Sequence, residues 1–145
     1  MQAKQINDIP KTWALIFDKG DEVAEVLKNF ARKNNLHASQ ISAIGAFSDL
    51  TLGFFVLEKK NYKHIHIHEQ VEVLSLLGDI SVSDGEPKVH AHVVVGKTDG
   101  TAHGGHLIKA HVMPTLEVIL TESPRHLRRT FDPAIGLPLI DLSKD

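Results

Sequence analysis

The pattern of hydrophobic and polar positions divides the chain into one helical stretch and a series of strand-like stretches. From Asp21 to about Lys33, apolar residues recur at three- and four-residue spacing, which predicts an amphipathic helix. Acidic residues come early in this stretch, and Arg32 and Lys33 come late, as the helix dipole favours. We expect one helix here, directly after a first strand.

Short apolar or alternating runs elsewhere predict strands, some of which we expect to merge or split. These runs are Trp13–Phe17, Gln40–Phe47, Thr51–Leu57, Tyr62–His68, Gln70–Ile80, Lys88–Val95, His106–Met113 and Thr115–Thr121. Residues 123–145 mix leucines with proline and glycine, which predicts an extended tail packed on the same sheet or on a neighbouring subunit. Together these elements predict a single α+β domain over residues 1–145, with a core at about 12–122 and a largely antiparallel sheet that carries the helix on one face.

The composition argues against nucleic acid and anionic membranes as general binding partners. A chain of 145 residues that is 42% hydrophobic fits one domain, and its net charge of −2 gives no general attraction to nucleic acid or to an anionic membrane. The one basic cluster comprises Arg125, His126, Arg128 and Arg129. We interpret it as a short solvated helix in preference to a phosphate site.

The N-terminal residues suggest no export signal. They include Asp8 and Pro10 and lack an apolar run followed by a small-residue cleavage site. No apolar run approaches the length of a membrane span, and the chain has no cysteine. We therefore expect a cytoplasmic protein with no membrane partner.

Three histidines flank one predicted hairpin in the segment 89–107. Side chains alternate between the two faces of a strand, so His90 and His92 project to one side, roughly 7 Å apart. The position of His106 depends on the length of the loop that joins the two strands. Two registers compete.

A two-residue loop, Asp99–Gly100, would pair His106 with Val93 and turn it away from the other histidines. A three-residue loop, Thr98–Gly100, would place it directly opposite His92, with its glycine supplying the positive φ that such loops need. We favour the second register, although a bulge at the following glycine pair would re-aim His106.

Three imidazoles on one face indicate a metal site. Zinc accepts nitrogen ligands, and three protein ligands leave a coordination position for water or a substrate. Without cysteine, a soft-metal site here must use imidazole and carboxylate groups, so we place zinc first, with nickel, copper or iron as alternatives. The competing interpretation is three half-buried histidines that bond to backbone carbonyls.

Seven further histidines lie outside this cluster. His64, His66 and His68 alternate with isoleucines, and the outer two lie about 13 Å apart on a straight strand. A solvent-facing strand is therefore favoured over a second metal or anion site. The other four are expected beside the cluster, as partners or spectators (His103 and His111), or on the surface (His37 and His126).

Glu72 interrupts the apolar run VEVLSLLGDI on the face of Leu74 and Leu76. An unpaired carboxylate on such a face is costly, which leaves three interpretations. Glu72 hydrogen-bonds a metal-bound histidine, accepts a proton from metal-bound water as a candidate catalytic residue, or lies at the sheet edge. The sequence contains no G-x-S-x-G nucleophile motif and no phosphate-binding glycine loop.

The segments AIGAFSDLTLGFF, EVLSLLGDIS and HAHVVVGKTDGTAHGGHL together resemble the PPC domain, which plants and prokaryotes share. The resemblance extends from the predicted helix through TLEVILTE. It implies an α+β domain that assembles as a homotrimer, with metal-binding residues at His90, His92 and His106 and with zinc in some prokaryotic members. Plant relatives add an AT-hook containing RGRP. This sequence has no RGRP, so the resemblance does not bring DNA binding with it, and nucleic acid is not an expected partner.

Three functions remain open from the sequence. The first is a homotrimer that binds zinc and holds a small anionic or carbonyl ligand at the open position, in a binding or sensing role. The second is a metal-dependent hydrolase or lyase with Glu72 as the proton-transfer group. The third is an interaction module with structural histidines that presents a surface to another protein or, weakly, to DNA.

Overall fold

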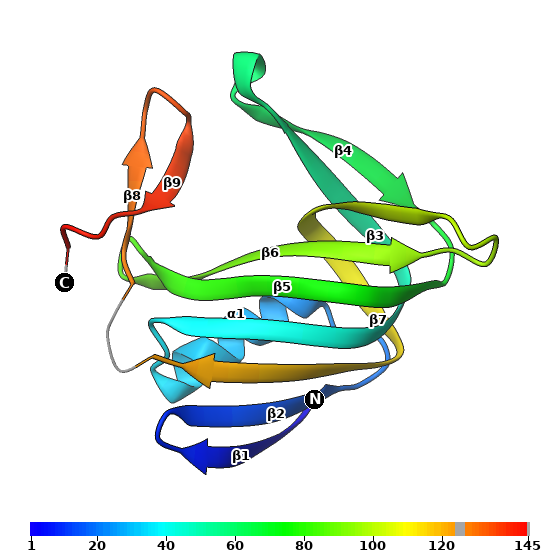
Figure 1. Ribbon diagram of the computed structural model, residues 1–145, viewed down its shortest axis with the longest axis horizontal. Helices are drawn as coiled ribbons and strands as arrows, with labels where there is room; N and C mark the ends of the chain where they lie inside the picture. Colours follow the sequence, from blue (N-terminus) through cyan, green and yellow to red (C-terminus); the bar gives the residue numbers. More distant parts are fainter. Residues whose placement is uncertain (124–126, 145) are drawn as a thin grey trace.

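A computed structural model describes residues 1–123 and 127–144 and confirms the predicted α+β class (Figure 1). A seven-stranded antiparallel sheet carries one α-helix, and a separate two-stranded sheet follows. The elements in chain order are β1 (Gln2–Asp8), β2 (Lys11–Phe17), α1 (Val23–Asn34), β3 (Ser39–Val56), a 3-10 turn (Leu57–Lys59), β4 (Asn61–Ile67), β5 (Val71–Ser83), β6 (Glu86–Gly96), β7 (Ala102–Glu122), β8 (Arg129–Asp132) and β9 (Leu137–Ile140).

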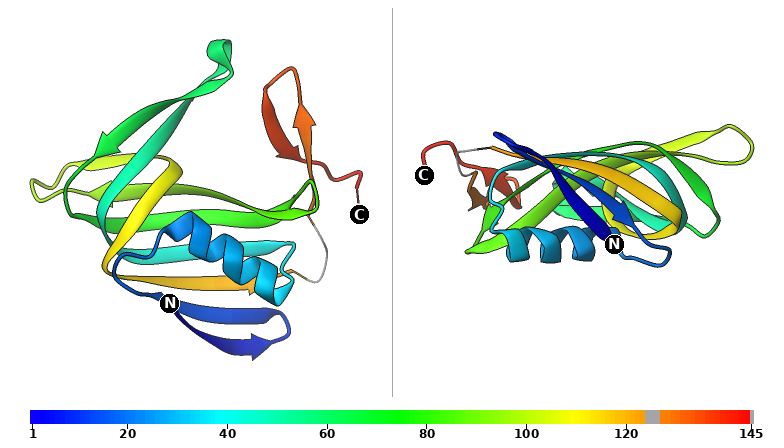
Figure 2. Two further views of the ribbon diagram at one scale, coloured as in Figure 1. Left: turned by 180° about the vertical axis from the view of Figure 1, so that it is seen from behind. Right: turned by 90° about the horizontal axis from the view of Figure 1, so that it is seen from below.

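Helix α1 forms where the periodicity predicts it. The Glu22 carboxylate caps its N-terminus by accepting a hydrogen bond from the Glu25 backbone N–H at 2.7 Å, and Asn35 ends it in the left-handed conformation. The helix lies against one face of the large sheet (Figure 2). Its apolar stripe, which includes Leu27 and Phe30, is buried in the core. We call the opposite face of the sheet, away from α1, the outer face.

The sheet curves because two long strands exchange partners along their length. The strand order is β1-β2-β7-β6-β5-β3-β4, and β3 also pairs with β7. The first half of β3 lies beside β5 and its second half beside β4, while β7 follows its other edge. The sheet therefore bends back on itself around the apolar core.

Two predicted breaks between strands are absent, because β3 and β7 each replace two expected strands. Bulges explain the continuity of β3. Its register with β7 shifts between Gly45 and Phe47 and again between Phe47 and Asp49. These shifts let Phe47 and Leu50, three residues apart, both face the core, where strict alternation would separate them.

The chain termini differ from expectation. The sequence does not predict strand β1, because QAKQIND is mostly polar and lacks an alternating apolar pattern. All seven residues are exposed, and pairing with the edge of β2 alone gives them the strand conformation. The extended tail folds as the β8–β9 hairpin. The prediction of a solvated basic helix is wrong for Arg129, which begins β8 with its side chain only 7% exposed. Arg125 and His126 of that cluster lie outside the described residues.

Several large apolar side chains remain exposed on the outer face. Ile44 (60% exposed), Leu74, Leu77 and Ile119 line one shallow pocket between β3, β5 and β7. We call these four residues the apolar patch. In the part of the chain that is described, no helix is long and apolar enough to cross a bilayer.

Gly78 provides a test of how closely β5 and β6 approach each other. A Cβ added there would lie 2.3 Å from the backbone oxygen of His90 and 2.9 Å from Cα of Ala91. We expect Gly78→Ala to lower the free energy of unfolding by about 2–3 kcal/mol, because backbone must move to admit the methyl group. Urea denaturation followed by circular dichroism measures this change.

Gly104→Ala is the matched control, since its nearest contact, the backbone oxygen of Val93, lies at 3.2 Å. It should cost less than half as much. Equal losses in the two variants would show that close packing at Gly78 is not the cause.

Candidate metal centre

The loop between β6 and β7 sets the register of the histidines. The Lys97 backbone N–H donates to the Thr101 carbonyl at 2.9 Å and closes a three-residue loop, in which Gly100 has φ +80°. His92 therefore pairs directly with His106 across the two strands. The favoured register is confirmed, and the two-residue alternative is excluded.

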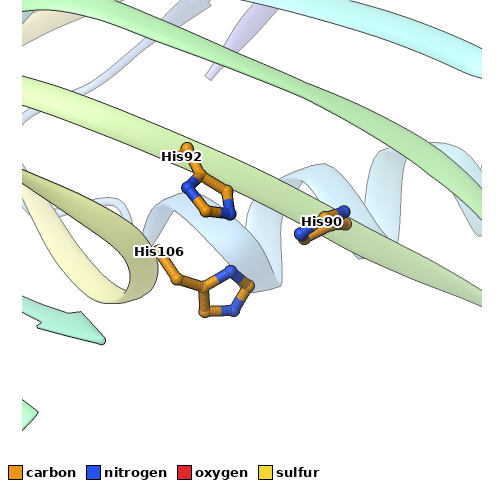
Figure 3. Close-up of side chains that lie close together, drawn as sticks. All are labelled: His90, His92 and His106. Carbon is orange, nitrogen blue, oxygen red and sulfur yellow. The ribbon is translucent and has the colours of Figure 1, made fainter. Parts of the chain in front are cut away.

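The three imidazoles converge on the outer face of the sheet (Figure 3). One potential ligand atom from each of His90, His92 and His106 lies within 4.8 Å of the others. The ring centroids are 5.3–5.4 Å apart. Ala91 and Val93 alternate with the first two histidines and are buried in the core, which fixes the direction in which the imidazoles point.

The ring of Tyr62, on β4, packs against the His106 imidazole. Tyr62 of β4 stacks on the His106 imidazole with a centroid distance of 4.8 Å and an interplanar angle of 20°. It reaches this position by lying over Gly53, where an added Cβ would come within 2.7 Å of the Tyr62 ring. The absence of a side chain at Gly53 therefore makes room for one wall of the site.

Burial keeps at least two of the imidazoles neutral. Burial, followed by the charges of His90, His92 and Lys88, lowers the pKa of His106 to about 4. Burial, followed by the charge of His90, also lowers the pKa of His92. At neutral pH both rings therefore offer lone pairs without first losing a proton.

His106 also has an unpartnered atom. Its Nδ1 is buried and has no hydrogen-bond partner among the described residues. Such a group carries a desolvation cost that a ligand to nitrogen would remove. This argues against the interpretation that all three histidines bond to backbone carbonyls.

The donor set fits a transition metal. Zinc–nitrogen bonds are about 2.0–2.1 Å long, so the most distant nitrogens would have to approach each other by about 1.5 Å, which side-chain rotation can provide. Three imidazoles without a carboxylate in the cluster suit zinc, copper, nickel or iron better than calcium or magnesium.

A charged pair adjoins His90 and was not predicted from the sequence. Asp79 of β5 lies directly opposite His90 of β6, with 3.5 Å between carboxylate Oδ2 and ring Nδ1. Arg129 pairs with the same carboxylate at 2.9 Å. The signal was present in the sequence, because a two-residue turn at Asp84–Gly85 makes Asp79 and His90 cross-strand partners.

Glu72, the candidate proton-transfer residue, is not brought to the histidines. It is exposed and pairs with Gly96, four residues beyond His92 on the same strand. That spacing corresponds to roughly 13 Å along β6, too far for direct proton transfer to a group bound at the cluster.

The remaining histidines are dispersed. His64 and His66 lie on edge strand β4, and His68 comes directly after it. All three are exposed, with neighbouring ring centroids 6.1 and 5.9 Å apart. His111 contacts Asp49 at 2.9 Å, away from the cluster. His103 is exposed, His37 is half-buried, and His126 lies outside the described residues.

The chain belongs to the Plants and Prokaryotes Conserved (PCC) domain family, whose sequence profile matches residues 5–124. This is the PPC family that the sequence motifs resemble. The matched region contains all three clustered histidines and ends before the β8–β9 hairpin.

Two solved structures illustrate the similarity. A candidate DNA-binding protein from Bacteroides thetaiotaomicron superposes with a TM-score of 0.93 at 28% identity, over 99% of this chain and 98% of its own. The metal-containing protein AF0104 from Archaeoglobus fulgidus gives a TM-score of 0.84 at 37% identity, over 90% of this chain and 92% of its own.

A similar segment also occurs in a much larger protein. The bifunctional protein GlmU from Synechococcus is 31% identical over 128 residues, which cover 86% of this chain. The match spans only 19% of that protein's length, so its activities do not carry over to this chain.

The low pKa of His106 predicts how stability depends on pH in the metal-free protein. Its folded value of about 4 lies below the ordinary value of 6.5, so the unfolded state binds more protons between these pH values. The stabilising contribution is fully present above pH 6.5 and is lost as the pH falls toward 4. Urea denaturation at several pH values should show this decline.

Removing the imidazole should flatten this dependence. We expect His106→Gln to lose less stability than the wild type between pH 6.5 and 4, whereas His103→Gln, at an exposed position, should follow the wild type. Parallel curves for the wild type and His106→Gln would contradict the assignment.

Proposed function

We propose that this protein binds zinc through His90, His92 and His106 and uses the remaining coordination position to hold a small anionic or carbonyl ligand, in a binding or sensing role. The carrying observation is the convergence of three ring nitrogens within 4.8 Å, with Nδ1 of His106 buried and unpartnered among the described groups. Three protein ligands leave the metal accessible on one side.

The protonation state of the histidines and the similarity to a metal-containing protein both support metal binding at this site. At least two of the three ligands are held neutral by burial, which favours binding of a cation at neutral pH. The Archaeoglobus relative is described as metal-containing at 37% identity. When bound, zinc would supply a Lewis acid, while the imidazoles orient it and Tyr62 shields one side.

We further propose that the chain assembles as a homotrimer. The apolar patch supports self-association, because contiguous exposed apolar side chains on a sheet face are costly in water. The patch adjoins the metal centre, since Leu77 pairs directly with His92. A neighbouring subunit seated on the patch would cover this border of the site.

Metal content tests the first proposal. Protein purified without a histidine tag and supplied with zinc should contain an equimolar amount of metal by mass spectrometry of the elements. His92→Ala should abolish this because it removes one of three ligands. Metal-free wild-type protein under these conditions would refute the proposal.

His103→Ala is the matched control, since it removes an exposed histidine from the same hairpin and should leave metal content unchanged. Small ligands that co-purify with the metal-loaded protein and are lost with His92→Ala would identify the chemistry at the open position.

Light scattering coupled to gel filtration tests the assembly. The wild type should have about three times the 16.0 kDa mass of one chain. Ile44→Asp should shift it to the monomer, because burying an unpaired carboxylate at the interface is costly. Ile9→Asp, at an exposed position distant from the patch, should remain a trimer. A monomeric wild type would rule out the trimer.

A further inference from the structure

The C-terminal hairpin (β8 and β9, residues 129–140) reaches the candidate metal centre through one buried side chain. Arg129 places Nη2 2.9 and 3.1 Å from the two Asp79 carboxylate oxygens and 3.3 Å from Nδ1 of His90. With the side chain only 7% exposed, its charge requires a partner, and Asp79 supplies it.

The other polar atoms of Arg129 and Asp79 also have hydrogen-bond partners. Arg129 donates from Nε to the Ser81 hydroxyl at 2.7 Å and from Nη1 to the Pro138 carbonyl at 3.0 Å. The Ser81 hydroxyl donates to Asp79 at 3.2 Å. The carboxylate is therefore held in place on two sides, with Oδ2 directed toward His90.

The two charged groups have opposite effects on His90. A guanidinium only donates hydrogen bonds, whereas an ionised carboxylate only accepts them. When Nε2 of His90 gives its lone pair to a metal, the ring proton must be on Nδ1, and of these two neighbours only Asp79 accepts it. A carboxylate at this position selects the metal-binding tautomer and orients the ring.

We propose that Asp79 is a positioning residue for His90, and that Arg129, by holding Asp79, couples docking of the C-terminal hairpin to metal binding. This inference rests on the proposed function. Because coupling is reciprocal, zinc should stabilise the docked hairpin, and the docked hairpin should strengthen zinc binding. The hairpin lies beyond the segment that matches the family profile, so this coupling extends the site past the shared domain.

Zinc affinity tests the role of Asp79. We expect Asp79→Asn to bind zinc about 10- to 100-fold more weakly than the wild type in a titration against a competing chelator. Asp49→Asn is the matched control, because it alters another Asp–His pair, with His111, and should leave zinc affinity unchanged. An Asp79→Asn protein that is folded by circular dichroism and binds zinc as tightly as the wild type would overturn the inference.

The tautomer gives a second readout, which a purely structural role would not change. Long-range ¹H–¹⁵N spectra of the zinc-loaded wild type should show His90 protonated at Nδ1 and metal-bound at Nε2. Metal bound through Nδ1 would overturn the role of Asp79.

Hydrogen exchange tests the coupling to the hairpin. Zinc should slow exchange of the backbone amides of residues 129–140 in the wild type. This protection should be smaller in Arg129→Lys, because lysine keeps the positive charge but cannot bond Ser81, Asp79 and Pro138 at once as the planar guanidinium does. Unchanged exchange in the zinc-loaded wild type would overturn the coupling. A wild type that binds no zinc would overturn the proposed function itself, whereas zinc binding with an unaffected hairpin overturns only this inference.

Discussion

The antiparallel register between β6 and β7 is the constraint on which the candidate metal centre depends. Because side chains alternate along a strand, a shift of one residue would turn His106 toward the core and separate it from His92. The three-residue loop closed by Lys97 and Thr101 fixes this register, and Gly100 supplies the required positive φ. The same pairing directs the neighbouring valines and leucine into the core, so the energy of core packing also holds the histidines together.

A site built on strands differs from one built on mobile loops. His90 and His92 lie on a strand paired on both sides for at least part of its length, and His106 is held between that strand and Tyr62. Burial in this frame keeps His92 and His106 uncharged at neutral pH. The resulting arrangement is prepared for a cation before one binds, which reduces the reorganisation that binding requires.

The outer face brings three features of the molecule into contact. The apolar patch meets the histidines where Leu77 pairs with His92, and the C-terminal hairpin meets them where Arg129 contacts Asp79. The proposed metal site, the proposed subunit contact and the docked hairpin therefore adjoin one another. In such an arrangement, a metal bound at the histidines would affect the adjoining apolar patch and hairpin. The contacts that join them are ordinary apolar packing and charge pairing.

Local sequence determined much of this protein. Helical periodicity located α1, alternation placed His90 and His92 on one face, and loop chemistry favoured the register of His106. Tertiary structure alone decided the conformation of Arg129, because its charge partner Asp79 lies 50 residues away and no local pattern reveals it. It also decided the continuity of β3 and the placement of Tyr62 over Gly53. Bulges and cross-strand contacts of this kind depend on which strands become neighbours, and that is a property of the folded sheet rather than of any one segment.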